Sequence, residues 1–342
     1  MGIALVALAV VAVIAPFQDL FIQSLLTEIL VFGILAMSLD ILLGYTGLPS
    51  LGHAAFFGVS AYGSAIVMTK KDWTWTYNLF VWSDNLGLGI FYLLAVGLVV
   101  AFVFSVVFGY LAIRATGAYF LMINLSFAMV VWGLAYRWSA VTGGDNGIII
   151  PARPELLGIS IDEPLVFFYF TLGVFLLCLG LLYLVTISPF GKTLVGIRER
   201  ETRMQMLGYN VWLHKYLAYM IAGTVAGVSG VMWTLFNLFV SPPDVELIVS
   251  AEALFMVALG GPATLIGAVI GAAIIRTLQQ FVSIYIENWP LILGSIYILT
   301  IMVSRLYGVE GILGLIGKLH EFQSKRRNRS NRSGDNGAPS RQ

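Results

Sequence analysis

The residues whose types could bind a ligand or do chemistry are concentrated in the stretch 188–210, which reads SPFGKTLVGIRERETRMQMLGYN. It contains Gly191-Lys192-Thr193, the closing letters of a phosphate-binding P-loop. A P-loop also requires a glycine five residues before that glycine, and a strand leading into the loop. The residue there is Thr186, at the end of an apolar run typical of a membrane helix. We therefore expect that this chain does not bind or hydrolyse ATP.

The same stretch instead predicts a short helix outside the membrane. Ser188-Pro189 ends the preceding apolar span, because proline disfavours helical conformation in the residue before it. Residues 192–207 are good helix formers, and Gly208-Tyr209-Asn210 ends them. Glu199 and Arg203 have the spacing of a favourable i,i+4 ion pair. The pattern by itself leaves open the alternative of a solvated loop with one helical turn.

The elements that must position this stretch are strongly apolar. Of the 342 residues, 59% are hydrophobic and 11% are charged, whereas a soluble domain is about 25% charged. We therefore expect an all-α, polytopic membrane protein. The net charge of +1 gives no reason to expect a nucleic-acid partner. The single cysteine, Cys178, excludes a disulfide within the chain, and the three histidines have no metal-ligand spacing, so we expect no metal and no cofactor.

Ten segments are candidates for membrane spans, since a spanning helix needs about 20 mostly apolar residues. These segments are 3–16, 20–43, 50–68, 87–113, 118–136, 164–187, 212–238, 249–261, 263–284 and 289–307. Glycine and small residues in 50–68 and 249–284 predict half-helices or re-entrant pieces there. We expect 8–10 spans in a transmembrane domain over residues 1–320, followed by a disordered basic tail over 321–342.

Lysine and arginine predict the orientation, because they are enriched in cytoplasmic connections. If the chain has ten spans, thirteen lysine and arginine residues lie on the side of the 188–215 connection and the tail, and four lie on the other side. This count places both termini in the cytoplasm and the 138–162 connection outside. The predicted location is the cell membrane, or inner membrane, of a bacterium or archaeon.

Four stretches resemble the permease subunits of ABC importers for branched-chain amino acids, specifically the M-type partner of a heterodimeric pair. The resemblance covers residues 30–318. Its stretches are GYTGLPSLGHAAFFGVSAY (44–62), ATGAYFLMINLSFAMVV (115–131) with VTGGDNGI (141–148), SPFGKTLVGIRERETRMQMLGYNVWLHKYLAYMIAGTVAGVSGVMW (188–233), and SAEALFMVALGGPATLIGAVIGA (250–272).

The resemblance implies a non-catalytic membrane subunit with several partners. These are a second homologous permease subunit, two cytoplasmic ATP-binding subunits and an extracytoplasmic substrate-binding protein. Branched-chain or other neutral amino acids are the implied solutes, with urea or short amides as the close alternative. An ion-coupled secondary transporter is the alternative of another class, since broken helices and buried acids also occur there.

The resemblance also implies that the 188–210 stretch docks on an ATP-binding subunit. A short charged helix suits this role, because only a stiff element can carry the closure of an ATPase into the membrane. The expected charged contacts are Arg198, Glu199, Arg200, Glu201 and Arg203, the expected apolar contacts are Leu194, Ile197, Met204 and Leu207, and the expected hinges are Gly191 and Gly208.

Three groups of residues are candidates for lining a translocation path. Irregular backbone inside a membrane persists only where protein or a water-filled cavity surrounds it, which favours Ser50, Gly52 and His53. Their alternative is tight helix packing, with His53 bonded to a neighbouring carbonyl.

The other two groups lie in the outer connection and in an apolar segment. Thr142, Gly143 and Gly144 are the second group, with a plain surface turn as the alternative. Glu252 is an intramembrane charge, a type that suggests function or pairing. It can pair with Arg276, line the path, or cap a half-helix, and capping near the outer interface is the least costly explanation.

Overall fold

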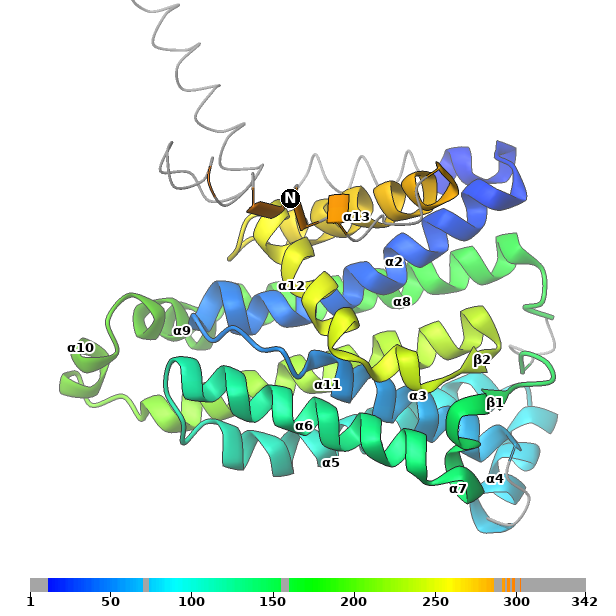
Figure 1. Cartoon of the computed structure of the whole chain (residues 1–342), viewed down its shortest axis with the longest axis horizontal. Coiled ribbons are helices and arrows are strands. Elements are labelled where there is room, and N and C mark those ends of the chain that lie inside the picture. The colour runs from blue at the N-terminus through cyan, green and yellow to red at the C-terminus, as the bar shows by residue number, and fades with distance from the viewer. Residues whose placement is uncertain are drawn as a thin grey trace, which may run out of the picture.

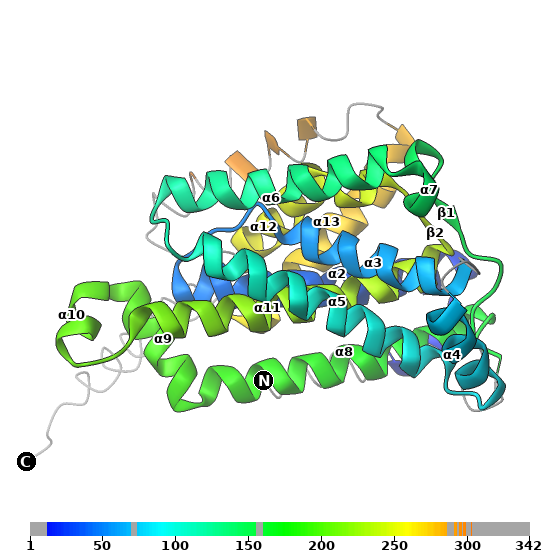
Figure 2. The ribbon, with the colours of Figure 1, turned by 90° about the horizontal axis from the view of Figure 1, so that it is seen from below.

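A computed structural model of the protein describes residues 12–69, 74–154 and 160–285, with a few further positions between 291 and 302. Its long helices run side by side along one axis (Figure 1, Figure 2). Among the described residues, six helices are long and apolar enough to cross a membrane. They comprise α2 (Leu20–Asp40) with η2 (Ile41–Thr46), α5 (Gly89–Ala112), α6 (Ala118–Arg137), α8 (Pro164–Ile187), α11 (Val211–Asn237) and α13 (Leu265–Tyr285).

These helices confirm the prediction of an all-α, polytopic membrane protein. They coincide with six of the ten predicted spans. Most of the predicted spans 3–16 and 289–307, and the whole of the predicted tail 321–342, lie outside the described residues. The total of ten spans therefore stays a prediction.

Two shorter helices begin inside the bundle. After η2, residues 47–52 are not helical and lead back from the end of α2 to the start of α3 (His53–Thr69; Figure 1). The other is α12 (Leu247–Gly260), which has only 14 residues. The backbone N–H of Ala54 donates to Oγ of Ser250 at 2.8 Å, so the first turns of α3 and α12 meet. The prediction of half-helices or re-entrant pieces stays a prediction for α3 and α12, and it does not fit α13, which lies in the same segment 249–284 and is long enough to cross a membrane.

The two ends of the bundle carry different elements. At one end lie α9 (Pro189–Glu199) and α10 (Glu201–Met206). At the other end lie α4 (Thr74–Asn85), α7 (Ser139–Thr142) and a two-stranded antiparallel sheet of β1 (Ile148–Ile149) and β2 (Phe239–Val240) (Figure 1). The connections predicted to be cytoplasmic and external therefore lie at opposite ends. The remaining short elements are η1 (Ala15–Phe17), η3 (Gly144–Asn146) and η4 (Pro242–Val245).

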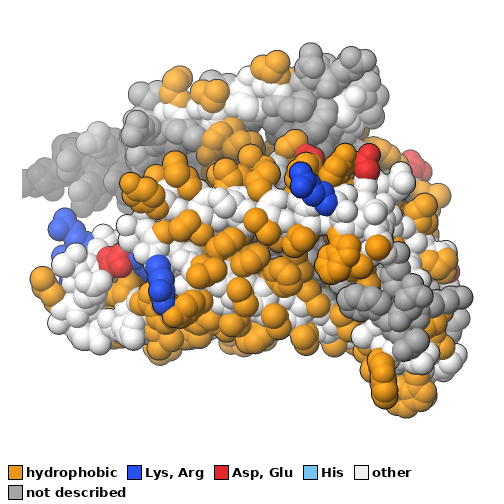
Figure 3. Space-filling view, turned by 60° about the horizontal axis from the view of Figure 1, so that its bottom comes forward, with side chains coloured by type: hydrophobic (Ala, Val, Ile, Leu, Met, Phe, Trp, Pro, Cys, Tyr) orange, Lys and Arg blue, Asp and Glu red, His pale blue; other side chains and the backbone are white. Residues whose placement is uncertain are grey.

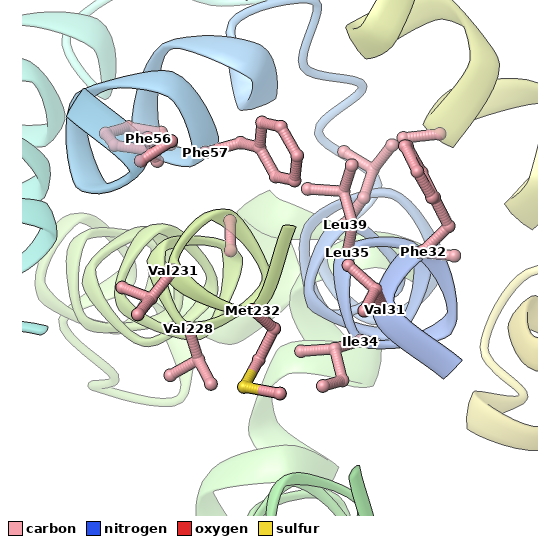
Figure 4. Packing of buried hydrophobic residues seen from close by; sticks show 14 of the residues in the cluster. Val31, Phe32, Ile34, Leu35, Leu39, Phe56, Phe57, Val228, Val231 and Met232 are labelled. Atoms are coloured by element: carbon pink, nitrogen blue, oxygen red, sulfur yellow. The ribbon is translucent and has the colours of Figure 1, made fainter. Parts of the chain in front are cut away.

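Small residues let the central helices approach closely, as membrane helices commonly do. α11 packs against α2, α3 and α5. At Gly230 of α11, an added Cβ would collide with the carbonyl oxygen of Phe57 in α3. Large side chains fill the space around these contacts, including Phe32, whose ring centroid lies 5.1 Å from that of Trp233. Figure 4 shows this packing between α2, α3 and α11.

Arg153 bonds to carbonyl groups at the C-terminal end of α11, which lies beside the sheet. Its Nε donates to the carbonyl of Leu235 at 2.7 Å, and its Nη2 donates to that of Phe236 at 3.0 Å. A cation at the last carbonyls of a helix is favourable. Burial lowers the pKa of Arg153, yet the guanidinium stays charged because the ordinary pKa of arginine lies far above neutral.

The outer faces of the helices are apolar. Figure 3 shows hydrophobic side chains over most of the face in view, with few charged side chains among them. Exposed examples on α5 and α8 are Val99, Val103, Leu177 and Leu181. Such a surface suits hydrocarbon rather than water.

Candidate coupling segment and translocation path

The 188–210 stretch begins with a sharp turn between two helices. Oγ of Ser188 accepts a hydrogen bond from the backbone N–H of Gly191 at 3.3 Å, which caps α9. An added Cβ on Gly191 would collide with the carbonyl oxygen of Thr186, so the close return on α8 requires glycine here. Gly191-Lys192-Thr193 forms the first turns of a helix, not a phosphate-binding loop.

The helix predicted over 192–207 is in fact two helices. Arg200 has extended backbone, with φ −153° and ψ 97°, and separates α9 from α10. Glu199 and Arg203 lie on different helices, so the i,i+4 arrangement predicted for them does not exist. Glu201 instead pairs with Lys215 of α11, with 2.7 Å between Oε2 and Nζ. Gly208 has φ +86° and ends the segment, as predicted.

One face of α9 is buried in this chain. Leu194 and Ile197 are only 1% and 3% exposed. Nη1 of Arg198 donates to the carbonyl of Gly44 at 2.6 Å, so this side chain also points into the bundle. The expected role of Leu194 and Ile197 as contacts for a partner does not agree with this burial, because both side chains already pack within their own chain.

The opposite face of the segment is open. Met206 is 83% exposed and Leu207 is 66% exposed, and Glu199, Arg200 and Arg203 are exposed as well. Met204 is half-buried, with its sulfur against Gly196. Met206 was missed by the sequence analysis because its position on the open face depends on the break at Arg200, which no residue pattern marks.

A buried polar cluster lies beside the meeting point of α3 and α12. The hydroxyl of Tyr219 donates to Oδ1 of Asn124 at 2.6 Å, and Oγ of Ser50 lies 3.4 Å from the same oxygen. Gly52 lies against the backbone of Asn124 so closely that an added Cβ would come within 2.7 Å of its carbonyl oxygen. His53 is fully buried nearby. We call Ser50, His53, Asn124, Tyr219 and Ser250 the interior polar cluster.

Ser50, Gly52 and His53 therefore lie together at this cluster, and their role in lining a translocation path stays a prediction. Asn124 and Tyr219 were missed, although a lone asparagine in an apolar span is a signal of buried polarity. Their proximity to Ser50 depends on how α6 and α11 pack, which the chain order does not reveal.

Glu252 belongs to a separate ion-pair network. Its Oε2 lies 2.6 Å from Nη2 of Arg276, and Nη1 of Arg276 lies 3.2 Å from Oε1 of Glu28. The Arg276 guanidinium also lies over the ring of Phe32, 3.2 Å from its centroid. The structure thus confirms the pairing with Arg276, and a role of Glu252 in lining the path stays a prediction. The helix-capping interpretation is wrong, because α12 begins at Leu247, five residues before Glu252.

Thr142, Gly143 and Gly144 lie away from both groups, at the end of the bundle that carries the sheet. Oγ1 of Thr142 donates to the carbonyl of Ala135 at 2.6 Å. The two glycines have φ values of +77° and +62°, which favour glycine. These contacts build a tight turn, and a role of the turn in the path stays a prediction.

The described residues contain no group of three or more His, Cys, Asp or Glu side chains that could hold a metal ion. The polar groups just described are hydroxyls, amides and an ion-pair network. Their arrangement supports binding and packing within a membrane bundle.

Comparison with known proteins identifies the family of the chain. Residues 21–304 match the family profile described as "Branched-chain amino acid transport system / permease component". No solved structure gives a significant match.

Several curated relatives cover most of the chain. It is 25% identical over 329 residues to the high-affinity branched-chain amino acid transport system permease protein LivM of Escherichia coli K12, covering 89% of this chain and 74% of the relative. LivM of Salmonella typhimurium LT2 matches with the same identity and coverage. The probable branched-chain amino acid transport permease protein LivH of Methanocaldococcus jannaschii is 24% identical over 290 residues, covering 81% of this chain and 87% of the relative. The chain thus belongs to the family of permease components of branched-chain amino acid transport systems.

Proposed function

We propose that this chain is one of two membrane subunits of an ATP-driven importer for branched-chain amino acids. A soluble binding protein outside the membrane delivers the solute, and two separate subunits hydrolyse ATP. The observation that carries the proposal is the α9–α10 segment, which stands at one end of an apolar bundle with one face buried in the bundle and the other face open.

The names of the relatives support the solute class. LivM and LivH are both described as branched-chain amino acid permeases. Urea and short amides remain the substrates to exclude by competition. A gradient-driven secondary transporter is disfavoured because residues 21–304 match the permease component of a branched-chain amino acid transport system.

The open face of α9–α10 is the proposed contact for an ATP-binding subunit. Its exposed apolar side chains, Met206 and Leu207, lie beside the charges of Arg200 and Arg203. A contact with apolar anchors inside a charged rim is typical of stable protein interfaces. Glu199 extends the charged rim, and Gly208 ends the segment.

The interior polar cluster is the proposed constriction of the translocation path. Half-helices that meet inside a membrane place backbone ends and polar side chains where solutes pass in other transporters. In this arrangement the hydroxyls of Ser50 and Tyr219 both bond to Oδ1 of Asn124. Separation of α3 from α6 and α12 would expose these groups to the solute.

The orientation belongs to the same proposal. The end with α9 and α10 faces the cytoplasm, together with both termini and the basic tail, because ATP-binding subunits work there. The permease domain extends over residues 1–320, and the membrane is that of a bacterial or archaeal cell.

Reconstitution tests the function directly. The chain is purified with its second permease subunit and its ATP-binding subunits, placed in vesicles, and supplied with the binding protein and labelled leucine. We expect leucine uptake that requires ATP and is not reduced by excess urea. Uptake by this chain alone, driven by an ion gradient, would overturn the proposal.

A further inference from the structure

We infer that Arg198 is a positioning residue that transmits the movement of α9 to the end of α2 and to the turn between α12 and α13. The inference rests on the proposed docking of α9–α10, but it assigns Arg198 to a different task. Arg198 contacts the backbone of its own chain, whereas the exposed residues of the segment are the proposed contacts for the ATP-binding subunit.

The side chain of Arg198 packs against η2 and against Gly47, the residue that follows it. Its side-chain stem packs on Gly47, where an added Cβ would lie 3.1 Å from Cγ of Arg198. Gly47 also has φ +73°, which favours glycine. The guanidinium donates to the carbonyl of Gly44 at 2.6 Å. Movement of α9 therefore acts on the backbone of residues 44–47 through a charged hydrogen bond and direct packing.

The element that receives this contact is a wide turn. Residues Ile41–Thr46 form a π-helix, and the N–H of Leu48 donates to the carbonyl of Leu42 at 2.8 Å. A π-turn is a local departure from α-helical bonding, common at functional sites. Such a turn can tighten or unwind without breaking α2 itself, so it suits a joint between α9 and the membrane helices.

Gly44 connects this joint to the turn between α12 and α13. An added Cβ on Gly44 would collide with Oδ1 of Asp40 and with the backbone nitrogen of Ala263. The same Oδ1 accepts a hydrogen bond from that N–H at 2.8 Å. Asp40 is fully buried. One closely packed point thus joins α2, η2 and the 261–264 turn.

The turn itself has a backbone conformation that needs support. Ala263 has φ +62°, in the left-handed region that is unfavourable for a residue other than glycine. The bond from Asp40 helps to hold it. Gly260, the last residue of α12, lies directly against the backbone of Gly267 in α13, so the two helices pack closely on either side of the turn.

The far end of α12 reaches the interior polar cluster. Oγ of Ser250 accepts the N–H of Ala54 at the start of α3. Contacts therefore run from α9 through η2 and the 261–264 turn, and along α12, to the constriction proposed for the path. A residue that only stabilises the fold would make the same contacts. The experiment therefore measures the coupling of ATP hydrolysis to transport separately from the assembly of the complex.

The experiment uses the complete transporter in vesicles, and measures leucine uptake, ATP hydrolysis and the amount of bound ATP-binding subunit. For Arg198→Ala we expect unchanged assembly, continued ATP hydrolysis, and a fall of about tenfold in leucine moved per ATP hydrolysed. Arg198→Lys should restore part of the ratio, because an ammonium can donate to the Gly44 carbonyl. Lys192→Ala, an exposed change on the same helix, is the matched control.

Asp40 variants extend the test along the chain of contacts. Asp40→Asn keeps an oxygen that can accept from Ala263 and should keep the ratio, whereas Asp40→Leu should lower it. Combining Asp40→Leu with Arg198→Ala should lower the ratio no further than one change alone, as expected for residues that act as a unit.

Three results would overturn the inference. The first is a wild-type ratio in Arg198→Ala. The second is loss of the ATP-binding subunit in that variant, which would place Arg198 in the docking face. The third is full additivity with Asp40→Leu. If Arg198→Ala does not assemble in the membrane, Arg198→Lys decides: a ratio that is at least partly retained supports the donor to the Gly44 carbonyl, and complete loss of coupled uptake overturns the inference. Absence of ATP-driven uptake by the wild-type complex would instead refute the proposed function.

Discussion

Arg276 shows how one residue organises three helices. Its guanidinium contacts Glu252 of α12, Glu28 of α2 and the ring of Phe32. In a membrane such a group is costly unless it is paired. The network therefore specifies how α2, α12 and α13 sit against one another, and Glu252 is more directly explained by this pairing than by contact with a solute.

Replacing Arg276 tests this assignment. Arg276→Met leaves the buried Glu252 carboxylate without its partner, and breaking a buried pair in this way costs about 3–5 kcal/mol. We expect a clear fall in the melting temperature of the detergent-solubilised protein. Glu28→Gln is the milder comparison, because Glu28 is more exposed and the Arg276–Glu252 pair remains. Equal stability of Arg276→Met and the wild type would contradict the assignment.

At the scale of the element, glycine decides how near two helices lie. Gly230 places α11 against the backbone of α3, and no side chain fits between them. Gly180 of α8, by contrast, has open space around it. Glycine is therefore required for close packing at Gly230 of α11 but not at Gly180 of α8, although both helices are apolar.

This difference gives a matched pair of variants. Gly230→Ala should destabilise the protein by about 1–3 kcal/mol, because overpacking pushes α11 away from α3. Gly180→Ala should be neutral or slightly stabilising, since alanine is the better helix former. Thermal unfolding in detergent measures both. Equal effects of the two changes would mean that the close contact at Gly230 is not limiting.

The α9–α10 segment carries the second prediction at this scale. Met206→Asp combined with Leu207→Asp removes the apolar part of the open face without touching the buried face. We expect the ATP-binding subunits to be lost on co-purification, because desolvated apolar anchors supply most of the energy of such contacts. Lys192→Asp, on the same segment but outside the proposed contact, should retain them. Retention by the double variant would contradict the docking face.

For the whole molecule, the arrangement of the two ends makes a prediction about sidedness. Single cysteines are placed at Ile149 and Thr202 in a Cys178→Ala background, since both positions are exposed at opposite ends. A membrane-impermeant maleimide applied to intact cells should label position 149 and spare position 202, because lysine and arginine favour the cytoplasmic side of 202. Labelling of 202 alone would reverse the orientation.

The amino-acid pattern alone was sufficient for the class of the molecule. Long apolar runs must be helical in a membrane, since each backbone group needs an internal partner, so six spans were predicted close to their observed bounds. The pattern was also sufficient to exclude a P-loop at Gly191 and to indicate a helix in 188–210, although it left a solvated loop as the alternative. It predicted half-helices or re-entrant pieces in 50–68 and 249–284, where α3 and α12 are short but α13 is long enough to cross a membrane.

Only the tertiary structure decided what those segments contact. The sequence treated Leu194, Ile197 and Arg198 as surface, because charge and spacing do not tell which face of a short helix is covered. It left Glu252 with three interpretations, because pairing with Arg276 depends on the turn between α12 and α13. Asn124 is 74 positions from Ser50 in the sequence and 95 positions from Tyr219, yet its side chain bonds to both. Such contacts follow from close packing between helices, which local propensity and hydropathy do not encode.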